Sequence, residues 1–297
     1  MEALRTPDDR FADLPGYPWA PRWLDALPGF EGLRLHTLDV GPRDASRTFL
    51  CLHGEPTWSY LHRRMLPVFL EAGARVVAPD FFGFGRSDKP VDDAWYTFTR
   101  HRASLLAFVE ALDLRGVILV CQDWGGLLGL TVLHEAPDRY AGLLVMNTML
   151  GTGDVPLTQG FRDWRAYMAK TPDLDCAKLM ARSCPHLTPA EAAAYGAPYP
   201  SARHLAGVRR FPQIVPEHPD DDGAAVSREA RDFLQHRWAG RTFMAIGMKD
   251  PVLGAPAMHA LRSLIRNCPE PFEHPDAGHF AQEWGDEIAR KAMPTFA

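Results

Sequence analysis

From about residue 33 the chain alternates short apolar or β-branched runs with longer segments of helical period, and this alternation constrains the fold more than any other feature. It is typical of a mostly parallel, doubly wound α/β sheet covered by helices. The later runs are continuously apolar, as expected for strands buried on both faces. We expect strands at residues 33–40, 48–52, 75–78, 117–121, 143–147, 242–246 and 271–274.

Two segments between these runs carry apolar residues at helical spacing. Such spacing favours a helix that packs one face against the sheet. The expected apolar faces consist of Leu105, Leu106, Val109 and Leu112 in the first segment, and of Met258, Leu261, Ile265 and Cys268 in the second.

The alternation stops near Gly151 and resumes near Arg241. The stretch between them is rich in proline and holds short helical pieces such as residues 190–195. Because this interruption is too long for a loop, we interpret it as an inserted helical domain. The sequence therefore predicts a core domain of residues 1–150 and 241–297 with a helical cap at 151–240.

Charge and cysteine usage exclude several function classes. The 297 residues include 32 Lys plus Arg against 37 Asp plus Glu, a net charge of −5, which is the wrong sign for a nucleic-acid partner. Five scattered cysteines are too few for a disulfide framework, and their odd number leaves a free thiol. We therefore expect a cytoplasmic compartment.

No targeting, membrane or metal signal stands out. The charged N-terminus does not fit a signal peptide, and Gln122 and Asp123 interrupt the most apolar window, residues 116–133. The histidines and cysteines do not match a zinc spacing, so we predict no metal and no cofactor. We also expect no membrane partner and a monomer.

The turn after the expected strand 117–121 has the layout of a nucleophile elbow. Asp123 stands where G-x-S-x-G enzymes carry serine, and Gly125 and Gly126 follow it. The alternative is an aspartate that caps the next helix. A helix cap does not need two glycines after it, so the pattern favours a nucleophile.

Three further turns follow strands, and ligands bind outside the carboxyl ends of such strands. The loop after residue 52 would supply the backbone N–H of Glu55 to an oxyanion hole, with a second N–H from Trp124. Asp250 and His279 follow the last two strands. Nucleophile, acid and histidine then occur in the chain order of α/β-hydrolases.

An aspartate nucleophile changes the chemistry, because a carboxylate is already ionised at neutral pH. Its attack on saturated carbon gives an alkyl ester, which a His–Asp pair and an oxyanion hole can hydrolyse. An epoxide leaving group would need a proton donor, for which Tyr167, Tyr195 and Tyr199 are available. A halide needs only N–H donors, and the indole of Trp124 suits that role.

At the motif level the chain resembles the haloalkane dehalogenases, first subfamily, over nearly its whole length. The specific marks are Asp-Trp at the elbow and Glu55 in the oxyanion loop, since other motifs are shared with epoxide hydrolases. The motifs that carry the resemblance are His-Gly-Glu-Pro-Thr-Trp at 53–58, Asp-Phe-Phe-Gly-Phe-Gly-Arg-Ser-Asp-Lys-Pro at 80–90, Gln-Asp-Trp-Gly-Gly at 122–126, Thr-Phe-Met-Ala-Ile-Gly-Met-Lys-Asp at 242–250 and Asp-Ala-Gly-His-Phe at 276–280.

The resemblance implies roles for single positions. Asp123 matches the nucleophile, His279 the base and Asp250 the acid, while Trp124 and Trp164 match the two halide-binding indoles. In other subfamilies an Asn replaces Glu55 as halide donor and the acid follows the strand that ends near Asn147, where this chain has none. The resemblance also implies an apolar substrate pocket of Phe161, Phe211, Pro212, Val215, Val252, Leu253 and Leu127, the last standing where another member has Phe.

These inferences predict an α/β-hydrolase with a helical cap that hydrolyses small haloalkanes to an alcohol and halide. Its partners would be the haloalkane, halide and water. Two alternatives stay open at this point: an epoxide hydrolase of the same fold, and a ligand receptor built on a hydrolase scaffold without catalysis.

Overall fold

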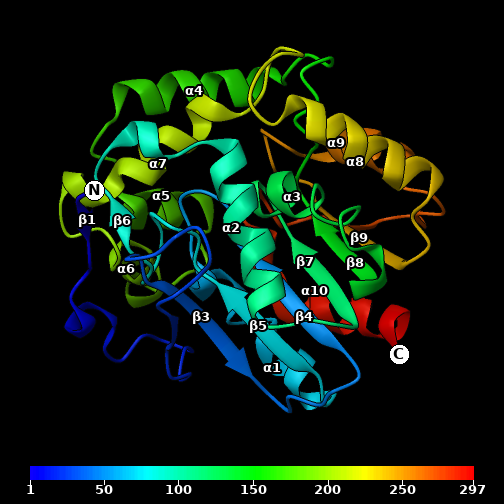
Figure 1. The fold of residues 1–297 in the computed structure, drawn as a ribbon, viewed down its shortest axis with the longest axis horizontal. Coiled ribbons are helices and arrows are strands. Elements are labelled where there is room, and N and C mark those ends of the chain that lie inside the picture. The colour runs from blue at the N-terminus through cyan, green and yellow to red at the C-terminus, as the bar shows by residue number, and fades with distance from the viewer.

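The computed structural model describes residues 1–297 and contains one large, mostly parallel sheet. Its eight strands run in the order β10-β9-β8-β7-β4-β5-β3-β2, parallel from β10 to β5 and antiparallel beyond (Figure 1). The strands are β2 (Arg22–Leu24), β3 (Leu35–Val40), β4 (Thr48–Leu52), β5 (Arg75–Pro79), β7 (Val117–Cys121), β8 (Tyr140–Met146), β9 (Arg241–Gly247) and β10 (Phe272–His274). A separate two-stranded sheet pairs β1 (Ala3–Leu4) with β6 (Lys89–Pro90).

All seven strands expected from the sequence are present, which confirms the α/β class. The central strands β4, β5 and β7 are buried along their whole length, as their continuous apolar runs predicted. β8 begins at Tyr140, three residues before the expected start at 143, and ends one residue before Asn147. The short β2 escaped prediction because three residues are too few to show a period.

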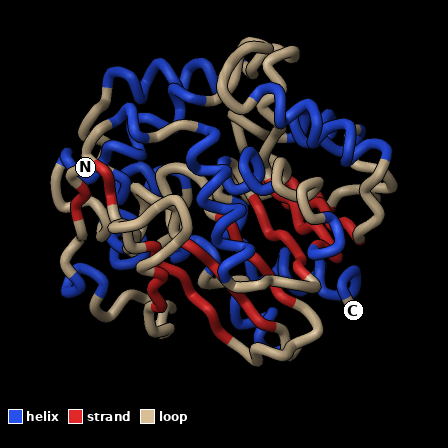
Figure 2. Tube along the Cα trace, in the orientation of Figure 1, coloured by secondary structure: helices blue, strands red, loops and turns tan.

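Helices cover both faces of the sheet. In Figures 1 and 2, α2 and α3 lie in front of the sheet and α10 lies behind it, in contact with α1. These helices are α1 (Leu66–Glu71), α2 (Phe98–Ala111), α3 (Trp124–Gly129), α8 (Ala224–His236), α9 (Ala255–Ser263) and α10 (Gly285–Ala292). Single 3-10 turns occur at Asp8–Phe11, Ser59–His62, Asp93–Trp95, Pro137–Arg139, Ala202–Leu205, Phe211–Ile214, Ala281–Trp284 and Met293–Phe296.

Each of the two expected apolar faces extends beyond the end of its helix. In α2, Leu105 and Val109 are buried. The helix α9 ends at Ser263, so Ile265 and Cys268 lie beyond it, although Ile265 still packs into the core. A helical period read from side chains alone does not show where the backbone leaves the helix.

The segment at 151–240 contains helices and no strand. Three of its helices begin at a side-chain cap: Thr158 caps α4 (Gln159–Lys170), Asp175 caps α5 (Cys176–Ser183), and Thr188 forms a capping box with Glu191 at α6 (Pro189–Gly196). The short α7 (Ala206–Arg210) follows. Local sequence thus defines where these helices begin.

The helix α8 contacts segments that follow α3 and α9. Phe233 of α8 packs 6.3 Å from the ring of His134, and the Leu234 carbonyl accepts a hydrogen bond of 2.9 Å from the backbone N–H of Arg266. Both partners belong to segments that flank the sheet. These contacts connect α8 to the parts of the chain outside residues 151–240.

Buried ion pairs join the α6 region to the rest of the molecule. Arg63 donates to both carboxylate oxygens of Glu283, at 2.7 and 2.8 Å, and reaches Glu191 of α6 at 3.1 Å. Tyr195 of α6 also donates to Glu283.

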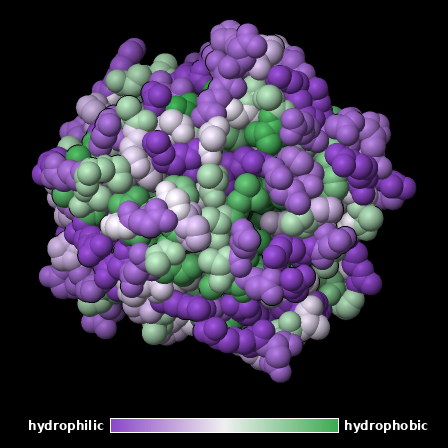
Figure 3. Space-filling view, viewed as in Figure 1, coloured by the Kyte–Doolittle hydropathy of each residue, from purple (hydrophilic) through white to green (hydrophobic).

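On the face shown in Figure 3, hydrophilic side chains predominate and hydrophobic ones form small groups. None of the helices has the length and apolar character needed to span a membrane.

Candidate active site

Asp123 lies in the sharp turn between β7 and α3, with φ 51° and ψ −126°. These angles are strained for a residue with a side chain. The two following glycines allow the turn because a Cβ on Gly125 would lie 2.1 Å from the Leu52 carbonyl oxygen, and one on Gly126 would lie 2.1 Å from Thr148 Oγ1. The elbow expected from the sequence is therefore present in its geometry.

Each oxygen of the Asp123 carboxylate faces a different group. Oδ1 accepts a hydrogen bond of 2.8 Å from the backbone N–H of Glu55, in the loop after β4. Oδ2 lies 3.5 Å from Nε2 of His279, in the loop after β10. A Cβ on Gly54 would lie 2.3 Å from Asp123 Oδ1, so only glycine at this position leaves room for the carboxylate.

The imidazole of His279 is held from behind by Asp250. His279 Nδ1 lies 2.9 Å from Asp250 Oδ2, and the same oxygen accepts 2.9 Å from the side-chain amide of Asn147. The other oxygen accepts 2.7 Å from the Val252 N–H. Burial alone would raise the pKa of Asp250, but the charge and hydrogen bond of His279, together with the backbone N–H groups of Val252 and Leu253, outweigh it and hold the pKa below its ordinary value.

His279 lies between two carboxylates and one amide. Burial lowers the pKa of its imidazole, but Asp250 and Asp123 outweigh burial and raise that pKa well above the ordinary value for histidine. Gln122 Nε2 lies 3.0 Å from His279 Nε2 and donates to the His279 carbonyl at 3.0 Å. Gln122 is itself buried. The ring is thus fixed in a position from which Nε2 faces Asp123.

The two tryptophans expected to bind halide differ in their surroundings. Trp164 on α4 donates its indole N–H to Glu55 Oε2 at 3.2 Å. Trp124, the first residue of α3, packs against Phe211 with ring centroids 4.4 Å apart and is almost wholly buried. Trp164 therefore belongs to the wall of the cavity beside Asp123, while Trp124 packs against Phe211 and is not one of the residues that line this cavity.

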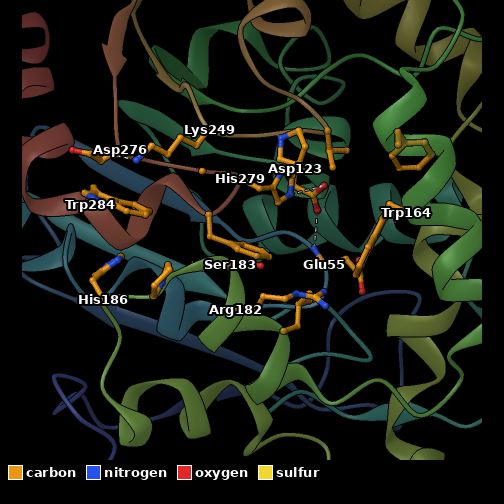
Figure 4. Close-up of a pocket in the computed structure, with 17 residues that line it drawn as sticks. Glu55, Asp123, Trp164, Arg182, Ser183, His186, Lys249, Asp276, His279 and Trp284 are labelled. Atoms are coloured by element: carbon orange, nitrogen blue, oxygen red, sulfur yellow. Dashed lines mark hydrogen bonds and ion pairs between the residues drawn. The ribbon is translucent and has the colours of Figure 1, made fainter.

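A cavity of about 760 Å³ opens beside Asp123. In Figure 4, His279 and Trp164 flank Asp123 from opposite sides, with Glu55 below it. Glu55, Asp123 and His279 come from loops after strands, as expected. The rest of the wall consists of Phe161, Trp164, Leu179, Arg182, Ser183, Pro185, His186, Lys249, Pro251, Val252, Asp276, Gly278, Phe280 and Trp284.

The apolar pocket expected from the sequence needs correction. Phe161 and Val252 line the cavity, but five of the expected residues do not. Phe211 is buried between the rings of Trp124, Phe84 and His101, which takes it off the cavity wall. The others that do not line it are Pro212, Val215, Leu253 and Leu127, all buried.

Comparison with known proteins agrees with this geometry. A family model described as the alpha/beta hydrolase fold matches residues 47–286. A haloalkane dehalogenase from Mycobacterium marinum is 43% identical, with 99% of each chain covered, and one from Psychrobacter cryohalolentis is 40% identical, with 98% of this chain and 96% of the relative covered. The chain belongs to the haloalkane dehalogenase family.

Within the haloalkane dehalogenase family, a solved structure from Paraglaciecola agarilytica NO2 has a TM-score of 0.97 and 49% identity to this chain, covering 99% of this chain and 98% of that one. That structure is described as tetrameric. The comparison therefore gives no support to the monomer expected from the sequence.

Sequence reasoning missed two polar residues that contact Asp250 and His279. Asn147 lies at the carboxyl end of β8, between the strands that carry Asp123 and Asp250, and its position after a strand was a usable signal. Gln122 directly precedes Asp123, and only its contact with His279 in the folded structure reveals its role. Sequence reasoning also missed the α5 part of the wall, including Arg182. No group of three or more His, Cys, Asp or Glu side chains could hold a metal ion.

Proposed function

We propose that this protein hydrolyses carbon–halogen bonds of small haloalkanes through a covalent alkyl ester on Asp123. The single observation that carries the proposal is the Asp123 carboxylate, held at a strained elbow with Oδ1 on the Glu55 N–H and Oδ2 facing His279. Family membership supports the same reaction class. The cavity lies within the range of about 300–1,000 Å³ usual for small-molecule sites.

In the first step Asp123 Oδ2 attacks the carbon that bears the halogen. The new C–O bond forms as the carbon–halogen bond breaks, and the halide leaves with the bonding electrons. The indole N–H groups of Trp124 and Trp164 are the donors proposed for the leaving halide. Oδ1 is the less available oxygen because it already accepts the Glu55 N–H.

In the second step His279 takes a proton from water, which attacks the ester carbon of Asp123. The backbone N–H groups of Glu55 and Trp124 stabilise the oxyanion that forms on Oδ1. Esterification removes the charge of Asp123, one of the two carboxylates that raise the pKa of His279. The imidazole therefore becomes easier to deprotonate when a base is needed. Breakdown of this tetrahedral intermediate releases the alcohol and restores the Asp123 carboxylate. Overall, one haloalkane and one water give one alcohol, one halide and one proton.

The arrangement favours the first subfamily of this family. Asp250 follows β9, and the position after β8 holds Asn147, which donates to that acid. Trp164 lies on α4, in the region expected as the cap. Glu55 occupies the place where other subfamilies have an asparagine.

We further propose that α4 to α7 form a cap over a core of residues 1–150 and 241–297, and that α8 belongs to this core. The cap expected at 151–240 would then lose α8, whose contacts with His134 and Arg266 favour counting it with the core. All five cysteines are free, which supports a reducing, cytoplasmic compartment.

The three tyrosines considered as proton donors for an epoxide hydrolase do not line the cavity. Tyr195 donates to Glu283, and Tyr199 donates to the Pro56 carbonyl at 3.2 Å. Tyr167 stacks on the outer side of α4 against Trp164. No tyrosine lines the cavity, so none is available to protonate an epoxide oxygen there.

The intact mass of a His279→Gln variant incubated with 1,2-dibromoethane tests the proposal. We expect an adduct of the bromoethyl group, because the variant forms the ester and cannot hydrolyse it. The adduct should be lost when Asp123→Ala is added. No adduct with any haloalkane would contradict the scheme, and ligand binding with negligible turnover would favour the receptor alternative.

A further inference from the structure

Glu55 contributes two different groups to the site. Its backbone N–H binds Asp123 Oδ1, while its side chain accepts the indole N–H of Trp164 at 3.2 Å. The remaining carboxyl oxygen, Oε1, is buried and has no hydrogen-bond partner. The residue is only 4% exposed although it lines the cavity. A partnerless carboxyl oxygen in a buried site is costly if the group is charged.

The indole N–H of Trp164, one of the expected halide donors, is therefore hydrogen-bonded to the Glu55 carboxyl group in the structure. Figure 4 shows Glu55 next to both Asp123 and Trp164. A carboxylate is a stronger acceptor than a neutral acid, so the charge on Glu55 decides how easily the indole N–H is released. A negative charge there would also repel an incoming or departing halide.

The surroundings of Glu55 disfavour its charged form. Burial, and after it the charge of Asp123, raise the pKa of the Glu55 carboxyl well above its ordinary value, against smaller opposing effects of Trp164 and His279. The other titratable or charged groups that face this region are Cys176 on α5, Tyr199 after α6, and Arg182 on the cavity wall.

We propose that Glu55 works as a neutral carboxylic acid that controls the halide site. While Glu55 keeps its proton, Trp164 is free to turn its N–H to the halide. Once ionised, Glu55 holds that N–H and repels the anion. The inference rests on the proposed halide site at Trp164 and adds to it a positioning residue whose proton decides halide affinity.

Bromide binding across roughly pH 5 to 10 tests the inference, measured by quenching of tryptophan fluorescence. The measurement is made in the His279→Gln background, because the imidazole would add its own pH dependence. We expect the bromide dissociation constant to rise about tenfold per pH unit above one midpoint. Adding Glu55→Gln should remove this rise and keep the affinity seen at low pH.

A second variant keeps Glu55 and changes its neighbour. In Asp123→Asn, which removes the negative charge beside Glu55, the rise should persist but begin at lower pH. A rise that persists unchanged in Glu55→Gln would overturn the inference, as would a midpoint that Asp123→Asn does not move.

The Trp164→Phe variant separates this inference from the proposed function. If Trp164→Phe binds bromide as tightly as its parent at low pH, the proposed halide site fails. If it binds more weakly while Glu55→Gln still shows the full rise with pH, the halide site stands and only the role of Glu55 is refuted.

Discussion

The side-chain amide of Asn147 donates a hydrogen bond of 2.9 Å to Asp250 Oδ2, the oxygen that also lies 2.9 Å from His279 Nδ1. Both residues follow neighbouring strands, β8 and β9, so adjacent positions on one sheet edge fix the direction of the imidazole. The amide oxygen of Asn147 accepts from the Gly247 N–H at 2.8 Å, which orients the amide in turn.

Replacing this amide should slow hydrolysis of the ester more than its formation. Hydrogen bonds to charged groups contribute about 1.5–3 kcal/mol, and about 1.4 kcal/mol corresponds to a tenfold change in rate. Asn147→Leu should therefore reduce the rate of ester hydrolysis about tenfold to a hundredfold, while the burst of halide release stays near the wild-type rate. Rapid-mixing measurements of both steps check this. Equal slowing of the two steps would show that Asn147 acts on something other than the base.

The pH dependence should appear in the second chemical step. In the proposed scheme His279 acts as a base only when neutral, and Asp250, which contacts its Nδ1 at 2.9 Å, raises the pKa of the imidazole. Lowering the pH through the pKa of His279 should slow hydrolysis by about tenfold per pH unit and cause the wild-type enzyme to accumulate adduct. The adduct fraction, measured by intact mass, should rise toward acid pH. In His279→Gln it should not change with pH.

The space around the Asp123 carboxylate depends on the glycine at position 54. A Cβ at Gly54 would meet Asp123 Oδ1 at 2.3 Å, and a displacement of about 1 Å can cost about a hundredfold in rate. Gly54→Ala should lose activity to about that extent. Gly196→Ala at the end of α6 is the matched control, because its Cβ would meet nothing closer than Ala177 at 3.4 Å. Full activity in Gly54→Ala would refute the assigned position of the carboxylate.

The buried pair between Arg63 and Glu283 should contribute to stability. Both side chains are almost wholly buried, and removing one partner of such a pair costs about 3–5 kcal/mol because the other charge is left without compensation. Glu283→Gln should therefore lower the free energy of unfolding by that order in denaturant titrations. The exposed pair of Lys249 and Asp276 offers a control, since Asp276→Asn should leave the midpoint close to wild type. Similar midpoints for both variants would contradict this.

The fold was readable from the sequence because buried parallel strands such as β4 and β7 are continuous apolar runs. The positions of the proposed triad were readable for a related reason: Asp123, Asp250 and His279 each lie two to five residues after the end of a strand. Parallel strands bring such positions to one edge of the sheet.

The cavity wall was harder to predict. Leu127 and Phe211 are as apolar as the residues that line the cavity, and only three-dimensional packing shows that both are buried away from it, Phe211 against Trp124. Arg182 reaches the cavity because α5 lies against it, which depends on how the helices between residues 151 and 240 pack. The hydrogen bond between Trp164 and Glu55 joins residues 109 positions apart, a relationship that no local pattern encodes.

The most direct test of the central claim is the fate of water oxygen in a single turnover. Enzyme in excess over 1,2-dibromoethane, in water labelled with heavy oxygen, should incorporate the label into residue 123, because water attacks the ester carbon. The alcohol from that first turnover should carry the unlabelled oxygen that Asp123 supplied. Label found in the alcohol and absent from the peptide containing Asp123 would contradict the account.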